Sequence, residues 1–184
     1  AEVWIAKIFI EQRKFADAKL ILDGLNEIAQ LQKKKTIKDY IPFLKKKENI
    51  LITGATGAGK SYIASALGNQ ACMNGFKTQY YNTTKLFQKL KMMKADGSYF
   101  KEVAKIEKQD LLILDDFGIQ QLDEMSRMAL LEIIEDRHGR ASTIVVSQLP
   151  VTKWFATIGD STIADAILDR LVHTAHRIEV QGES

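Results

Sequence analysis

Apolar residues along this chain recur with two different periods, and the two periods alternate. Short, nearly continuous apolar runs predict β-strands at 49–53, 77–82, 111–115, 142–147 and 177–180. Longer stretches with apolar residues every three or four positions predict helices at 2–32, 60–74, 84–94, 98–108, 123–138, 152–158 and 161–172. Strands that alternate with helices predict a parallel sheet covered by helices on both faces.

The third run, at 111–115, is apolar at both alternating sets of positions, which predicts a strand buried on both faces. We expect residues 1–47 to form an N-terminal helical segment, broken near Gly24, followed by a lysine-rich connector at 33–47. Residues 48–184 then form the core, and 46% hydrophobic residues are enough to fill one. The sequence therefore predicts an α/β fold with three α/β/α layers and a mainly parallel five-stranded sheet.

The composition carries no sign of a membrane-bound or secreted protein. No apolar run approaches the roughly 18 residues of a membrane span, and the first residues do not resemble a signal peptide. The single cysteine, Cys72, excludes an internal disulfide framework and is typical of a reducing cytosol. We therefore expect a cytoplasmic protein with no membrane partner, and the scattered histidines predict no zinc site.

Charge is distributed unevenly along the chain, although the net charge is only +3. Residues 1–29 carry a net charge of −1, residues 30–110 a net charge of +10, and residues 111–184 a net charge of −6. A basic middle beside an acidic end favours a polyanionic partner or head-to-tail self-association. The alternative is an ordinary soluble surface.

The segment GATGAGKS at 54–61 fits the pattern G-x-x-x-x-G-K-[ST] between a predicted strand and a predicted helix. Its glycines allow the backbone to wrap around a phosphate, and the helix that begins at Lys60 adds its positive dipole end. Lys60 can reach the β- and γ-phosphates, and the Ser61 hydroxyl can bind magnesium. The segment therefore predicts a P-loop NTPase that uses Mg²⁺. The predicted nucleotide-binding residues are Gly54, Ala55, Thr56, Gly57, Ala58, Gly59, Lys60, Ser61 and Tyr62.

Two carboxylates, Asp115 and Asp116, follow the apolar residues 111–114. A buried unpaired carboxylate is costly, so a cation is expected nearby. In P-loop proteins a strand beside the loop presents an aspartate to magnesium, and we assign this role to Asp115. We assign Asp116 as the general base for the attacking water, with a turn or helix-cap role as the alternative. Because aspartate is shorter than glutamate, slow hydrolysis and a mainly switch-like role for ATP both stay open.

Two further polar residues are candidates for the triphosphate site. Gln148 follows the strand predicted at 142–147, which we expect beside the aspartate-bearing strand, so its amide can reach the γ-phosphate or the water. The alternative is an ordinary strand end. Arg170 lies on the helix predicted at 161–172, and in head-to-tail subunits it can enter the neighbour's site and stabilise transition-state charge. The alternative is a local surface ion pair.

The helices predicted at 84–94 and 98–108 are rich in lysine, with several lysines spaced to share one face of a helix. Several cations on one surface are typical of contact with a nucleic-acid backbone. We see no base-reading motif and therefore predict sequence-nonspecific DNA contact, with a solvated face as the alternative for any single lysine. The candidates are Lys85, Lys89, Lys91, Lys94, Lys101, Lys105 and Lys108.

Five segments occur together between residue 49 and the end of the chain. They are GATGAGKS, LLILDDFG, ADGSYF at 95–100, SQLPVTKW at 147–154 and GDSTIADAILDRLVHTAHRIEVQGES at 159–184. Together they resemble the IstB family, the ATP-binding helpers of insertion-sequence transposition, which are similar to DnaC helicase loaders within the AAA+ ATPases. The resemblance implies a homo-oligomer that binds ATP between subunits, assembles on DNA, and recruits and stimulates a transposase.

The resemblance also implies a role for each matching position. Residues 54–61 would be the phosphate loop, Asp115 and Asp116 the magnesium and hydrolysis pair, and Gln148 at or next to the sensor position. Arg170 would be the arginine that acts in trans, and the two lysine-rich helices would line the DNA-facing side of the assembly.

Two features depart from the family pattern. The usual AAA+ core continues into a helical lid with a second sensor arginine, whereas only RIEVQGES remains here. We therefore expect the lid to be absent or greatly shortened. The connector before residue 49 is also short for the family, which raises the expectation that residues are missing near 29–40.

Three other functions share parts of this pattern. A replicative helicase loader has the same catalytic motifs and differs in its partner-binding N-terminal region. A non-hydrolysing DNA clamp would use ATP only to promote assembly. A small P-loop kinase would need an arginine-rich lid over its acceptor, which the region after Arg140 lacks.

Overall fold

The computed structural model describes residues 40–181. Contacts between Cα atoms divide the chain into two units, Ala1–Tyr40 and Ile41–Ser184. The helix predicted at 2–32 and the region near 29–40 lie outside the described residues, so the predicted division at residue 47 stays a prediction.

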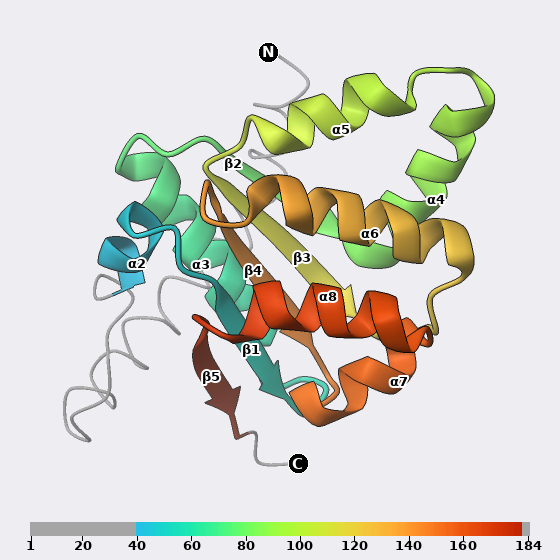
Figure 1. Cartoon of the computed structure of the whole chain (residues 1–184). Coiled ribbons are helices and arrows are strands. Elements are labelled where there is room, and N and C mark those ends of the chain that lie inside the picture. The colour runs from blue at the N-terminus through green and yellow to red at the C-terminus, as the bar shows by residue number, and fades with distance from the viewer. Residues whose placement is uncertain (1–39, 182–184) are drawn as a thin grey trace, which may run out of the picture. The chain divides into compact units, whose positions relative to one another are not determined.

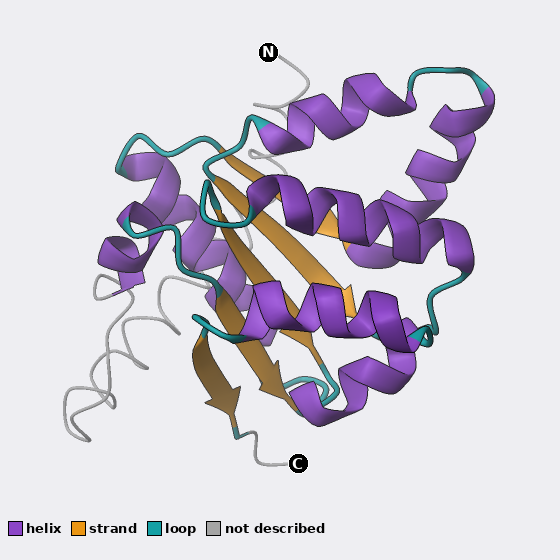
Figure 2. Cartoon of the chain, viewed as in Figure 1, coloured by secondary structure: helices purple, strands orange, loops and turns teal. Residues whose placement is uncertain are grey.

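A parallel sheet forms the centre of the second unit (Figures 1 and 2). Its strands are β1 (Ile50–Gly54), β2 (Thr78–Asn82), β3 (Leu111–Phe117), β4 (Ser142–Ser147) and β5 (His176–Val180). Their order across the sheet is β2-β3-β4-β1-β5, and every pairing is parallel. The predicted five-stranded parallel sheet is therefore confirmed, including the position of β4 beside β3.

Helices cover both faces of this sheet. They are α2 (Ile41–Lys45), α3 (Lys60–Met73), α4 (Thr83–Ala95), α5 (Tyr99–Glu107), α6 (Glu124–Arg137), the 3₁₀ turn η2 (Val151–Lys153), α7 (Trp154–Ile158) and α8 (Ser161–Val172). In Figure 1, α6 and α8 lie in front of the sheet and α3 lies behind it. The short helix α2 occupies part of the segment that we expected to be only a connector, because its Ile41 and Leu44 are buried. None of the described helices is long and apolar enough to cross a membrane.

Successive strand residues point to opposite faces of the sheet, and both faces are apolar. Leu51, Leu112 and Val145 belong to the core cluster formed with α4 to α8. Ile113 points to the other face, where it lies against Gly68 of α3, a position at which a Cβ would clash with it. The predicted burial of the third strand on both faces is therefore confirmed.

One buried arginine lies at the end of the sheet where the strands begin. Arg137 is 2% exposed and donates hydrogen bonds to the carbonyls of Ile106 (3.0 Å), Gln109 (2.9 Å) and Ser142 (2.5 Å) and to the Thr143 hydroxyl (3.2 Å). Burial lowers the pKa of Arg137 to about 10, so the guanidinium stays charged at neutral pH. It ties the end of α6 to the end of α5, to the segment before β3 and to the start of β4.

The carboxyl ends of all five strands lie at the opposite end of the sheet, which is where ligands bind in open parallel sheets. Asn82 at the end of β2 is in register with Asp115 on β3. Gly54 at the end of β1 is in register with Val180 of β5, and a Cβ on Gly54 would collide with the Val180 carbonyl oxygen. Glycine is therefore required there, and the loop after β1 leaves the sheet from a position that β5 fixes.

Candidate functional site

The loop between β1 and α3 has the backbone geometry of a phosphate cradle. Gly57 and Gly59 have φ angles of 81° and 82°, a region that glycine adopts without strain. Gly59 is the N-cap of α3 and no side chain caps this helix, while its first turn carries no acidic residue. The first amides of α3 are thus left for an anion, which the helix dipole also favours. Tyr62, the last predicted binding residue, is exposed on the first turn of α3.

Lys60 lies inside this loop with its charge only partly satisfied. The residue is 7% exposed, and its Nζ atom donates to the Ala55 carbonyl at 2.6 Å. No carboxylate among the described residues forms an ion pair with it. A buried ammonium without an anionic partner is costly, so an anionic ligand in the loop would stabilise it.

Asp115 is the buried carboxylate of the site, with 4% exposure. The Tyr80 hydroxyl donates to its Oδ2 atom, and the Asp116 amide donates to its Oδ1 atom at 2.8 Å. Thr83 fixes the backbone by donating to the Asp115 carbonyl at 2.7 Å. Two donors orient this carboxylate, yet no cation pairs with it in the described part of the chain.

Asp116 has an unusual backbone conformation, with a φ angle of 58°. The β3–β4 register shifts between Leu114 and Phe117, so β3 continues two residues past its predicted end through a local irregularity. The Asn82 amide donates to the Asp116 Oδ2 atom at 2.7 Å, while its Oδ1 atom accepts from the Lys85 amide at 3.1 Å. Asn82 therefore caps α4 and holds Asp116 at the same time.

Asn82 and Tyr80 are site residues that sequence reasoning missed. A signal for Asn82 existed, because asparagine followed by two threonines at the start of a predicted helix is typical of an N-cap. Its contact with Asp116 and the contact of Tyr80 with Asp115 depend on the pairing of β2 with β3. Local sequence does not encode that pairing.

The end of β4 brings Gln148 to the phosphate loop, whereas Ser147 has a structural role. The Thr56 hydroxyl donates to the Gln148 Oε1 atom at 2.7 Å. Ser147 is buried, and its hydroxyl donates to the Phe117 carbonyl at 2.7 Å and accepts from the Leu149 amide at 3.0 Å. The structure therefore places Gln148 beside the loop, and its proposed contact with a γ-phosphate stays a prediction.

The residues present fit a magnesium ion that arrives with a nucleotide. Among the described residues no group of three or more histidines, cysteines or acids is gathered to hold a metal alone. Magnesium usually takes one or two protein ligands and completes its shell with phosphate oxygens and water. Ser61, beside the phosphate loop, and Asp115, buried without a cation, would supply those ligands.

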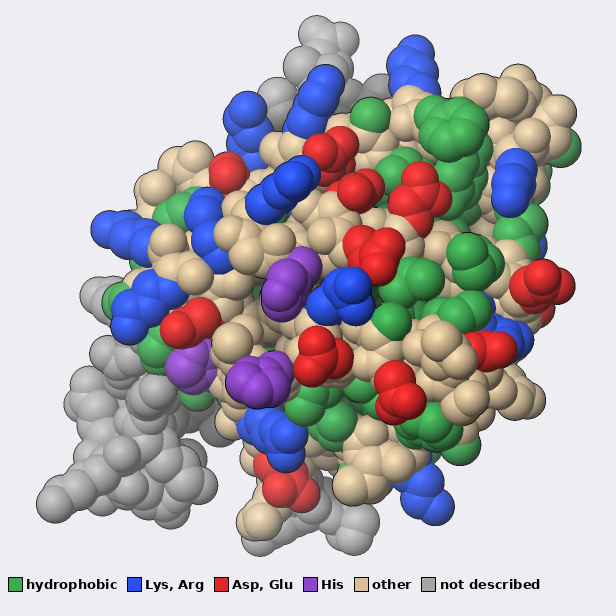
Figure 3. Space-filling view, viewed as in Figure 1, with side chains coloured by type: hydrophobic (Ala, Val, Ile, Leu, Met, Phe, Trp, Pro, Cys, Tyr) green, Lys and Arg blue, Asp and Glu red, His purple; other side chains and the backbone are tan. Residues whose placement is uncertain are grey.

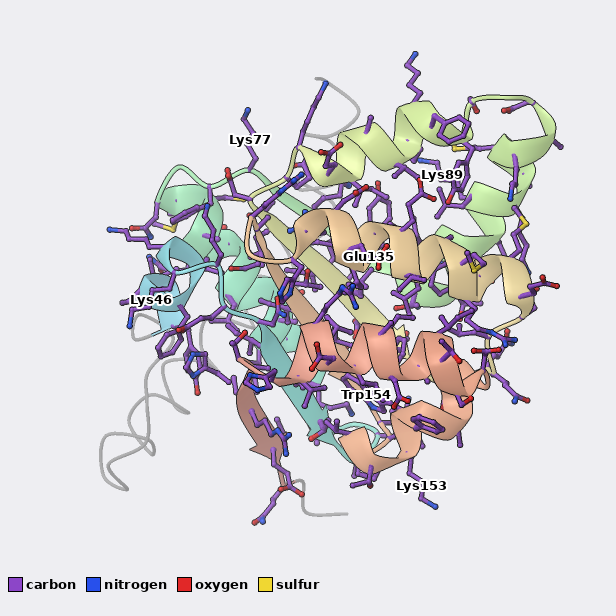
Figure 4. All side chains as sticks on the ribbon, viewed as in Figure 1. Lys46, Lys77, Lys89, Glu135, Lys153 and Trp154 are labelled. Atoms are coloured by element: carbon purple, nitrogen blue, oxygen red, sulfur yellow. The ribbon has the colours of Figure 1, made fainter. Side chains whose placement is uncertain are left out.

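Arg170 lies at the end of the sheet where the strands begin, and it does not reach the phosphate loop of its own chain. The carbonyls of Arg170 and Leu171 accept from the Asn49 side chain at 3.1 and 3.3 Å, just before the start of β1. The Arg170 side chain donates to the Ala166 carbonyl at 2.7 Å and pairs with Glu135 at 3.0 Å. Glu135 lies on α6 and is labelled in Figure 4. The local ion pair foreseen as the alternative is thus present, and a role in a neighbouring subunit stays a prediction.

Two of the predicted DNA-binding lysines are already neutralised by carboxylates. Lys89, which lies on α4 and is labelled in Figure 4, pairs with the buried Glu102 at 2.6 Å. Glu102 also accepts from the Tyr81 hydroxyl at 2.8 Å. Burial acts to raise the Glu102 pKa, but the hydrogen bonds from Lys89 and Tyr81 hold it below its ordinary value. Lys91 pairs with Asp123 and lowers the pKa of that carboxyl to about 2.

The other lysines of the set remain available. Lys94 lies 5.7 Å from the ring centre of Tyr99, a cation–π contact that leaves its charge uncompensated. The members of the predicted set that are exposed and form no ion pair within the described residues are Lys85, Lys94, Lys101, Lys105 and Lys108. Fewer lysines than the sequence count indicated are therefore free of an ion pair in the described chain, and DNA contact stays a prediction.

The sheet order, the glycine-rich loop and the paired aspartates define a P-loop nucleotide-binding protein of the AAA+ type. The chain belongs to the IstB-like ATP-binding protein family, whose sequence profile matches residues 7–184.

Relatives in this family come from bacterial insertion sequences. A putative insertion sequence ATP-binding protein of Sinorhizobium fredii is 50% identical over 137 residues, covering 74% of this chain and 56% of that protein. A second one from the same organism is 46% identical over 153 residues, covering 82% and 62%. A putative ATP-binding protein of a Pseudomonas fluorescens insertion sequence is 42% identical, covering 65% and 51%. The chain thus spans less than two thirds of the length of these relatives.

Two solved structures with the same fold illustrate the structural likeness. The crystal structure of DnaI has a TM-score of 0.68 at 21% identity, covering 89% of this chain and 85% of that one. The DnaC helicase loader has a TM-score of 0.65 at 18% identity, covering 78% and 85%. At these identities the likeness confirms the AAA+ fold alone.

Proposed function

We propose that this chain binds ATP with Mg²⁺ between subunits and hydrolyses it slowly. In the ATP-bound state it assembles on DNA and recruits an insertion-sequence transposase. The observation that carries the proposal is an uncapped helix start after the phosphate loop, at the same end of the sheet as Asp115, a buried carboxylate that lacks a cation within the described chain. A triphosphate and its divalent ion supply the charges that the two groups lack.

Each residue of the site has a defined task in this proposal. The amides of 54–61 and the Lys60 ammonium hold the β- and γ-phosphates. Ser61 and Asp115 hold Mg²⁺, which neutralises charge that develops on the phosphates. Asp116 accepts the proton of the attacking water. Asn82 orients the Asp116 side chain by donating to one of its carboxylate oxygens.

Gln148 links the phosphate loop to the end of β4. Its carbonyl oxygen accepts from Thr56, so its amide nitrogen is directed elsewhere and is suited to donate to a γ-phosphate oxygen. Gln148→Glu keeps the shape, removes this donor and adds a negative charge. It should lower hydrolysis by about tenfold or more while ADP affinity changes little.

Arg170 is proposed to act in the neighbouring subunit, since it lies at the sheet edge remote from its own loop. Mixing Arg170→Ala subunits with Lys60→Ala subunits tests this directly. Each variant alone should lack hydrolysis, and the mixture should recover part of it, because one interface then carries both intact residues. An absence of rescue in mixed oligomers, with their formation verified by light scattering, would contradict a role in trans.

DNA contact is proposed to depend on the lysines that form no ion pair in the described chain. A triple Lys101, Lys105 and Lys108→Ala variant should weaken DNA binding at all sequences and reduce the salt dependence, by up to about one unit of slope per lost phosphate contact. Lys91→Ala is the matched control, because its partner Asp123 already offsets its charge. An unchanged slope in the triple variant would place the DNA surface elsewhere.

The transposase partner rests on the relatives, whose names place them in insertion sequences. The single most informative experiment is ATP-dependent DNA binding measured against salt, with particle shape recorded by electron microscopy. ATP-dependent rings or filaments on DNA would support the proposal. Phosphate transfer to a small metabolite would instead identify a kinase, and a neighbouring gene for a replicative helicase would favour a helicase loader.

One substitution helps to distinguish an ATPase from a DNA clamp that binds ATP without hydrolysing it. Asp116→Asn removes the proposed base while the side chain keeps its size. Loss of hydrolysis with assembly intact would identify Asp116 as the base. Unchanged turnover would show that it is not, and a wild-type chain without turnover that still assembles would identify a clamp.

A further inference from the structure

A groove of about 490 Å³ lies between the α4–α5 turn, the start of α5 and the outer side of α6. It is separate from the phosphate loop, since no residue of the loop or of the Asp115–Asp116 pair lines it. One wall carries the apolar side chains of Phe100, Met128 and Leu131. Over α5 and α6, Figure 3 shows hydrophobic side chains bordered by acidic ones.

The apolar wall is unusually open to solvent. Phe100 is 75% exposed and Met128 is 49% exposed, although both are large hydrophobic residues beside a concave surface. Single exposed apolar residues are common, but several that line one groove are typical of an interaction site. Methionine and phenylalanine are also enriched in protein interfaces.

An acidic wall continues from the apolar one along the same helix. Glu132, Glu135 and Asp136 line it from α6, and their spacing places them together along one side of the helix. Lys94 is the only cation among the described residues that line the groove, and it lies against the Tyr99 ring. Glu135 already binds the guanidinium of Arg170 from the side of α8, so a carboxylate of this wall receives a cationic side chain within the chain itself.

We infer that this groove binds an amphipathic helix of another protein, one whose apolar stripe is flanked by lysine or arginine. Exposed apolar side chains and carboxylates next to one another in a single groove match the apolar stripe and the flanking cations of such a helix. The apolar stripe would cover Phe100 and Met128, and its cations would face Glu132 and Asp136. Nucleic acid is disfavoured here because the acidic wall repels phosphate.

A second copy of this chain fits less well, judged by the described residues. The lysine-rich helices α4 and α5 turn their apolar sides inward, with Leu86, Leu90 and Val103 buried in the core. Neither helix can present an apolar stripe without leaving its own core. The inference does not require ATP hydrolysis, so it stands or fails separately from the proposed function.

The test uses the whole chain and a fluorescent helical peptide of about 18 residues with leucine every three or four positions and lysine elsewhere. Phe100→Ser should weaken its binding by about tenfold, measured by fluorescence anisotropy. Met92→Ser is the matched control, because Met92 is 74% exposed on α4 but does not line the groove. It should change the affinity by less than about twofold.

Charge is tested in the same assay. Asp136→Lys should weaken binding by about fivefold or more, whereas Asp165→Lys, on α8 and outside the groove, should leave it nearly unchanged. A scrambled peptide of the same composition and a glutamate-for-lysine peptide should both bind weakly. The inference is overturned if the Phe100 and Met92 variants bind alike, if the acidic peptide binds equally well, or if Phe100→Ser changes the oligomeric state by sedimentation, which would place a second copy in the groove.

Discussion

Two buried carboxylates of this chain have similar surroundings but differ in one respect. Asp115 on β3 and Glu102 on α5 are 4% and 7% exposed. Each accepts a hydrogen bond from a tyrosine of β2, Asp115 from Tyr80 and Glu102 from Tyr81. Glu102 also pairs with Lys89, whereas no cation pairs with Asp115 within the described residues.

The difference separates a structural carboxylate from a functional one. Glu102 has a charge partner within the protein, so its pairing needs no ligand to stabilise the fold. Asp115 is oriented by the protein but not neutralised, so a cation from outside would complete it. Tyr80 and Tyr81 are neighbours on β2 and point to opposite faces of the sheet. Tyr81 thus supports a structural ion pair, whereas Tyr80 supports a candidate metal ligand.

The largest expected effect comes from neutralising each carboxylate in turn. Asp115→Asn should reduce ATP hydrolysis by about 10²–10³-fold and change the free energy of unfolding little. Glu102→Gln should lower the free energy of unfolding by about 1–3 kcal/mol, because Lys89 loses its partner, and leave nucleotide affinity unchanged. Hydrolysis assays and urea denaturation of both variants provide the measurements. The comparison is wrong if the two variants show the same pattern of losses.

The next effect concerns pH and the Lys89–Glu102 pair. In the wild-type chain the Glu102 pKa lies below 4.5, so its stabilising contribution is present above pH 4.5 and disappears as the pH falls through the lower folded value. In Lys89→Met, burial should dominate and raise the folded pKa above the unfolded one. The destabilisation, about 1–3 kcal/mol, should then be larger near pH 7 than near pH 4.

Urea denaturation near pH 7 and near pH 4 measures the loss of unfolding free energy in Lys89→Met at each pH. Lys85→Met is the matched control, since Lys85 is exposed and forms no ion pair within the described part of the chain. Its stability should follow the wild-type pH dependence. If Lys89→Met also follows it, the pair contributes nothing to the stability of the α4–α5 region.

The smallest expected effect distinguishes the two tyrosines. Tyr80→Phe and Tyr81→Phe should each lower the free energy of unfolding by about 1 kcal/mol, because each leaves a buried carboxylate without one donor. Saturating ATP and Mg²⁺ should reduce the loss for Tyr80→Phe only, since the ion would then contact Asp115. Thermal unfolding with and without the ligands measures both. Equal reductions for the two variants would remove the distinction.

Much of the fold could be predicted because its signals are local. The helix predicted at 161–172 and the strand predicted at 142–147 are confirmed at both ends, since each combines a clear hydrophobic period with polar flanking residues. The phosphate loop could also be predicted, because its glycines and Lys60 act through their own backbone and dipole geometry. Such features need no knowledge of distant neighbours.

The remaining features depend on contacts between distant parts of the chain. The strand that carries Asp115 was expected to end there, but β3 continues through the left-handed conformation of Asp116, which Asn82 contacts from β2. Lysine spacing predicted a larger basic surface, because a sequence does not show that Lys89 faces a carboxylate 13 positions away. The pair between Arg170 and Glu135 is of the same kind.

The contact between Gly54 and Val180 has a consequence for how the binding loop acquires its shape. The loop is a continuous eight-residue segment, yet its first residue lies against β5, a strand from a distant part of the sequence. A fragment that ends before β5 would carry every residue of the motif with its exit from the sheet unsupported. We therefore expect nucleotide affinity to depend on the pairing of β5 with β1. Transferring the eight residues alone to another strand would transfer the sequence motif without the contact that fixes its conformation.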